Sequence, residues 1–138
     1  MRNSVASQED LKFKDAFEAG RVSPADFNHL AHLRLAYVYL CQGDLRYAER
    51  KMCEALLGFL EANDIAGEKF HETLTRAWVM AVAHFMNRRS SSSFSDFSFS
   101  SLPLQDSKVM LTHYSAAALF SDRARKAFVE PDLDAIPC

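Results

Sequence analysis

Hydrophobic residues recur every three or four positions along most of the chain, which is the spacing of one face of an α-helix. This pattern predicts four main helices and two short C-terminal ones, over residues 7–19, 23–41, 45–62, 68–87, 105–114 and 121–128. Ser7 and Asp10 have capping-box spacing at the first helix start, and Gly20 and Gly43 lie where helices should end. No segment predicts a strand. We therefore expect an all-α fold, a compact bundle within a single domain that covers residues 1–138.

The predicted helix over residues 23–41 is the most apolar of the set. Ser23 is placed to cap it, and Pro24 suits its first turn. Beyond Phe27 its strongly polar side chains are few: Asn28, His29, His32 and Arg34. Since a helix that is apolar nearly all round is buried nearly all round, we expect the other helices to pack around this one.

Three histidines are expected to meet at the core. His29 and His32 are three positions apart and share one face of their helix, whereas His71 shares with Trp78 the core-facing side of the fourth helix. Three imidazoles with an open fourth position suit a catalytic zinc or iron ion. They equally suit proton transfer without a metal. The structural alternative is that each ring fills space and bonds a neighbour.

Glu72 follows His71 and is the candidate catalytic residue. A carboxylate in this position can act as a general base beside a bound water, or it can orient a ligand histidine. The alternative is an ordinary helix ion pair, because Arg76 lies four residues further on.

Residues 90–101 consist almost entirely of serine and phenylalanine. Serine at this density favours irregular structure, whereas Phe94, Phe97 and Phe99 are too apolar for a fully solvated linker. We predict a loop inside the domain, held to the bundle by one or more of these rings.

Composition narrows the class of protein. Hydrophobic residues make up 49% of the chain, charged residues 25%, and the net charge is −2, which argues against a nucleic-acid-binding protein. No stretch of 18 apolar residues predicts a membrane span, and residues 1–10 lack the apolar centre of a secretory signal. The three cysteines are widely spaced and form no CxxC pair, so a reducing, cytoplasmic location is expected.

The motif HxxHL at residues 29–33 and the motif FHETLTRAW at residues 70–78 carry a resemblance. With the FVEPDL segment at residues 128–133, they resemble a family of small, mostly bacterial, uncharacterised all-helical proteins with a (Y/F)HETxTRxW motif. The resemblance covers most of the chain from about Phe17. It implies that the two motifs belong to one unit, and it implies no particular reaction.

The leading hypothesis is a small metal-binding protein with a buried histidine site, hydrolase-like or oxidoreductase-like, that acts on a small-molecule substrate. Its ligands for one divalent zinc or iron ion would be His29, His32 and His71, with Glu72 as base. The alternative is a non-catalytic helical module that binds a protein partner and whose histidines are structural.

Overall fold

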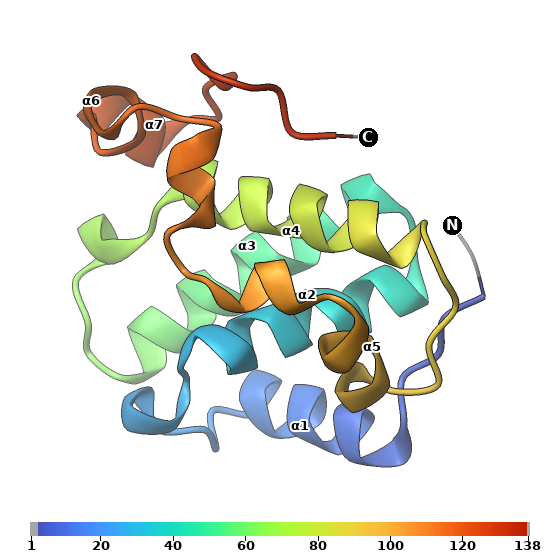
Figure 1. Ribbon diagram of the computed structural model, residues 1–138. Coiled ribbons are helices and arrows are strands. Elements are labelled where there is room, and N and C mark those ends of the chain that lie inside the picture. Colours follow the sequence, from blue (N-terminus) through green and yellow to red (C-terminus); the bar gives the residue numbers. More distant parts are fainter. Residues whose placement is uncertain (1–2, 138) are drawn as a thin grey trace.

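Residues 3–137, which the computed structural model describes, form helices and turns and contain no strand (Figure 1). The α-helices in this range are α1 (Gln8–Glu18), α2 (His29–Gln42), α3 (Leu45–Ala62), α4 (Glu72–Met86), α5 (Phe94–Ser100), α6 (Ala116–Leu119) and α7 (Asp122–Lys126). Short 3₁₀ turns lie between them: η1 (Pro24–Asp26), η2 (Gly67–Lys69), η3 (Leu102–Gln105) and η4 (Val109–Thr112). The predicted all-α class is confirmed.

Helix α2 lies at the centre of the bundle, packed against α3 and α4 (Figure 1). Its seven buried residues are Leu33, Leu35, Ala36, Tyr37, Val38, Tyr39 and Leu40. Helix α1 packs on α2 and α3, whereas α7 packs on α4. Helix α2 therefore contacts each of the other three main helices, as expected for the helix that contains HxxH. None of the helices in the described range is long and apolar enough to cross a membrane.

The start of α1 has the capping box that the sequence predicts. The Asp10 backbone N–H donates to Ser7 Oγ over 3.1 Å, and the Ser7 N–H donates to Asp10 Oδ2 over 2.9 Å. The Asp10 carboxylate is 3% exposed and also accepts hydrogen bonds from Arg34 Nε and from the Phe94 N–H. Burial acts to raise the pKa of Asp10, but these hydrogen bonds together hold it below its usual value. One carboxylate thus joins α1, α2 and α5.

The second main helix begins six residues later than predicted, and the predicted start at Ser23 is wrong. Ser23 makes no side-chain bond to the backbone, and Pro24–Asp26 closes only a single 3₁₀ turn. Asn28 is the true cap, since its Oδ1 accepts from the Ala31 N–H over 2.9 Å. Two adequate capping residues occur five positions apart, and packing decides between them.

The fourth main helix also starts later than the predicted range 68–87. Residues Gly67–Lys69 form a separate 3₁₀ turn, and the helix begins at Glu72 with His71 as its cap. The third helix, α3, has the predicted bounds.

Residues 90–101 were expected to be irregular, and this expectation is wrong, because α5 lies within them. Ser93 caps α5, accepting from the Asp96 N–H over 3.1 Å. Phe94 and Phe97 are three positions apart and both pack on Tyr37, with ring centroids 5.8 and 5.1 Å away. The predicted anchoring by phenylalanine is confirmed. A serine cap and two packed rings stabilise a short helix that its composition alone does not favour.

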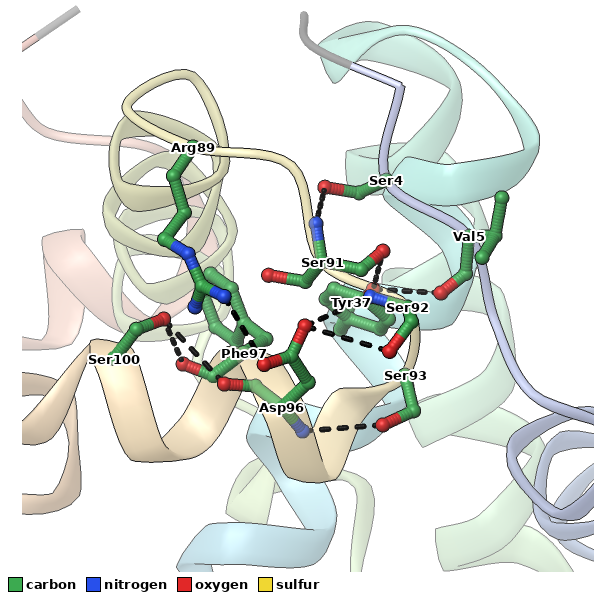
Figure 2. A network of polar contacts seen from close by, with 10 residues as sticks. All are labelled: Ser4, Val5, Tyr37, Arg89, Ser91, Ser92, Ser93, Asp96, Phe97 and Ser100. Atoms are coloured by element: carbon green, nitrogen blue, oxygen red, sulfur yellow. Dashed lines mark hydrogen bonds and ion pairs between the residues drawn. The ribbon is translucent and has the colours of Figure 1, made fainter.

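The N-terminal segment is bonded to the start of this region (Figure 2). Ser91 donates its N–H to Ser4 Oγ over 3.2 Å, and its carbonyl accepts from the Val5 N–H over 3.0 Å. Tyr37 of α2 donates its hydroxyl proton to the Val5 carbonyl over 2.6 Å. The N-terminal segment and the segment just before α5 are thereby tied to the central helix.

The predicted short helix over residues 105–114 is wrong, because η3 and η4 occupy that region instead. Asp106 Oδ1 accepts from the Lys108 N–H over 2.9 Å, a local side-chain bond that competes with helix formation. The other short helix is confirmed as α7, capped by Ser121, although it ends at Lys126 and not at residue 128.

Candidate functional site

A cavity of about 210 Å³ lies where the start of α4 meets α2 and α3. Most of its wall is apolar, built from three phenylalanines and three leucines: Phe27, Phe59, Phe70, Leu56, Leu60 and Leu74. Its polar lining residues are His32, Lys69, His71 and Thr75. Two of the three predicted ligand histidines therefore share one cavity.

The Nε2 atom of the His32 ring is buried and has no hydrogen-bond partner within residues 3–137. Its ring stacks on Phe27, with centroids 5.9 Å apart and planes 19° apart. Burial lowers the pKa of His32 to about 4, and the nearby His29 adds to the effect, so the ring is neutral at pH 7. A neutral imidazole keeps one donor and one acceptor nitrogen, and here the buried Nε2 has no partner.

His71 uses both of its ring nitrogens. Nδ1 accepts from the Leu74 N–H over 3.0 Å and so caps α4. Because Nδ1 accepts, the ring proton must be on Nε2, which donates to the Leu119 carbonyl over 2.7 Å. The ring is held between α4 and α6 and has no free nitrogen to offer a ligand.

His29 points away from the cavity that His32 and His71 line. As the first residue of α2 it bonds the Leu104 carbonyl through Nε2 over 2.8 Å. The edge of its ring packs on Trp78, with centroids 4.6 Å apart. His29 thus links η3 to the bundle, as expected if this histidine has a structural role.

Glu72 lies in a separate surface depression, not in the histidine cavity. Its carboxylate is 3.8 Å from Arg76 Nη1, the predicted ion pair, and accepts from Cys53 Sγ over 3.7 Å. Arg76 also bonds Glu49, with 3.4 Å between Nε and Oε2. Burial raises the pKa of Cys53 to about 12, and the nearby Glu72 carboxylate adds to this effect. The thiol is therefore protonated at pH 7 and is not a nucleophile.

These contacts do not fit the predicted three-histidine metal centre. Within residues 3–137 no three side chains of His, Cys, Asp or Glu are grouped to hold a metal ion. A metal on His71 would have to displace either the helix cap or the Leu119 carbonyl. The zinc or iron site at His29, His32 and His71, with Glu72 as base, therefore stays a prediction. The hydrogen bonds that His29 and His71 make do not favour it.

The HET motif has a structural use that sequence reasoning missed. Thr73 is fully buried; its hydroxyl donates to the Ala127 carbonyl over 2.9 Å and accepts from the Val129 N–H over 3.0 Å. Together with His71 it holds the C-terminal segment against α4. Sequence reasoning also missed Lys69 and Phe70 as cavity residues, because an exposed lysine beside a turn carries no pattern of its own.

Comparison of the chain with protein-family models, with curated proteins and with solved structures finds no match. The resemblance to a family of small helical proteins stays a prediction. The fold and the cavity define an all-helical protein with a small apolar site beside a histidine whose buried Nε2 has no partner in the described range.

Proposed function

We propose that the chain binds a small, largely apolar molecule in the cavity that His32 lines. The observation that carries this proposal is the contrast among the histidines. His29, His71 and His113 each bond a backbone carbonyl, and in the described range His84 has no nitrogen that is both buried and unpartnered. The Nε2 atom of His32, in contrast, is buried and has no partner within residues 3–137. A buried polar atom without a partner costs about 1–3 kcal/mol, and such an exception in a folded protein calls for an explanation.

The size and walls of the cavity define the class of ligand. An engineered apolar cavity of about 150 Å³ binds benzene, so the 210 Å³ here suits one aromatic ring or a pair of fused rings. Phe27, Phe59 and Phe70 offer ring faces and edges for such a ligand. A hydroxyl or N–H group on it would supply the hydrogen bond that His32 lacks.

We assign no reaction to this site. A neutral imidazole can act as a general base, but the carboxylate expected to assist it, Glu72, lies outside the cavity. We retain a reducing, cytoplasmic location as part of the proposal, supported by the free thiols of Cys41 and Cys53.

Thermal unfolding in the presence of indole, phenol or benzyl alcohol tests the proposal. A ligand that binds only the folded protein stabilises it by about 1.4 kcal/mol at roughly ten times its Kd, which is several degrees in Tm for a domain of this size. His32→Phe should abolish the rise in Tm, because it removes the polar group and fills part of the cavity.

His84→Phe is the matched control, since His84 is also on the bundle but lines a different cavity. It should respond to the probes as the wild type does. An unchanged wild-type Tm with all three probes would overturn the proposal, as would an equal rise in His32→Phe.

A further inference from the structure

The polar groups of the cavity carry one positive charge and no negative charge. The ten lining residues include Lys69 and no aspartate or glutamate. His32 is neutral, and His71 accepts a hydrogen bond at Nδ1, so it too is uncharged as it is held. A complementary ligand therefore carries a single negative charge.

Lys69 is placed to meet that charge. It is exposed, it ends the turn η2 beside the cavity, and it makes no ion pair within residues 3–137. Glu68 precedes it in the chain but does not line the cavity. An unpaired ammonium group at the edge of an otherwise apolar cavity is a simple receptor for an anion.

We infer that the ligand is an aromatic carboxylate, with its carboxylate beside Lys69 and a hydroxyl or N–H on its ring near His32. This inference rests on the proposed function and deepens it. An ionised carboxylate is costly to bury in an apolar wall, so it remains at the exposed lysine. The ring itself is apolar and fits among Phe27, Phe59 and Phe70. The ring hydroxyl or N–H then meets the unbonded imidazole of His32.

A pair of probes with the same shape isolates the charge. 4-Hydroxybenzoate and 4-hydroxybenzamide share the ring and the hydroxyl, and only the first is an anion at pH 7. Exposed ion pairs are weak, so the acid should bind wild-type protein about three- to fivefold more tightly than the amide at low salt. Raising the salt concentration should reduce this preference.

Calorimetric titration of both probes into wild type, Lys69→Gln and Lys108→Gln measures the effect. The preference for the acid should disappear in Lys69→Gln and persist in Lys108→Gln, which removes another exposed lysine that does not line the cavity. Equal binding of acid and amide to the wild type would overturn the carboxylate inference and leave the proposed function standing. A preference that survives in Lys69→Gln would do the same. Failure of both probes to bind would overturn the inference. The proposed function falls with it only if indole, phenol and benzyl alcohol also leave the wild-type Tm unchanged.

Discussion

The residue His32 differs from the neighbouring histidines in what its ring touches. Phe27 covers one side of the ring, and the buried Nε2 meets no donor or acceptor in the described range. In the unliganded protein this arrangement costs stability without a compensating bond. Sites that bind ligands are often less stable than the fold allows, because the groups that meet the ligand are left unpaired until it arrives.

His32→Phe is therefore predicted to stabilise the unliganded protein at pH 7 by about 1 kcal/mol. The substitution removes the unpaired nitrogen, and the larger ring has the adjacent cavity to occupy. Chemical denaturation measures the change. The matched control is His29→Phe, which should destabilise because it leaves the Leu104 carbonyl without its partner.

The pH dependence of the same two proteins gives a second readout of this prediction. The folded-state pKa of His32, about 4, lies below the ordinary value of 6.5, so the unfolded chain takes up a proton first as the pH falls. His32 therefore does not affect the pH dependence of stability above about pH 6.5, and the folded protein loses stability as the pH falls from 6.5 toward 4. Between pH 7 and pH 4.5 the wild type should lose about 2 kcal/mol more than His32→Phe does. A wild type with the same pH slope as the variant, or a destabilised His32→Phe, would contradict this assignment.

The sequence singles out His29, His32 and His71 as candidates, but it does not predict what their rings bond. HxxH on an apolar helix singled out His29 and His32. The partners of His29 and His71 are the carbonyls of Leu104 and Leu119, which come from a 3₁₀ turn and a one-turn helix far along the chain. Carbonyl groups are present at every residue, so no sequence pattern marks them as partners.

Among the helices, α4 depends most on a single residue at its start. His71 satisfies the Leu74 N–H and at the same time holds the Leu119 carbonyl of α6. Histidine is an unusual helix cap. Its side chain is long enough for one ring to bond both α4 and α6. The segment before α4 also forms part of the cavity wall, so the cap positions Lys69 and Phe70 as well.

His71→Ala should destabilise the protein by about 2 kcal/mol, since it removes the cap and one buried bond. His71→Asn should lose clearly less, because asparagine caps helices well but is too short to replace the imidazole at Leu119. Urea denaturation of the two variants gives the comparison. Equal losses would contradict the assignment of His71 as a cap.

The helix boundaries that sequence reasoning missed share one physical cause, which is competition between local signals. Ser23 and Asn28 are both good caps, and Asn28 prevails as the cap of a helix that buries Leu33 and the residues after it. In residues 90–101, Ser93 and the packed rings of Phe94 and Phe97 outweigh a loop-like composition. Long amphipathic stretches such as α3 have no such competitor, and their bounds were predicted correctly.

For the whole molecule, the periodic pattern sufficed to predict an all-α bundle around the helix that contains HxxH. The periodic pattern could not predict how the C-terminal third packs on the bundle, because that part is held by hydrogen bonds between side chains and distant backbone groups. For example, the Val129 N–H donates to the Thr73 hydroxyl, and the Tyr114 hydroxyl donates to the Val129 carbonyl over 2.6 Å. The cavity beside His32 is lined by residues between positions 27 and 75 and has no signature in the sequence.

The most direct test of the cavity as a ligand site is the ring ¹⁵N spectrum of the histidines, recorded while indole is added. Long-range ¹H–¹⁵N correlations report the tautomer of each ring and its hydrogen bonds. The account predicts that the His32 ring signals move in a saturable way, that His71 remains protonated on Nε2, and that His84 stays in place. A His32 signal that stays unchanged through the titration would contradict the account.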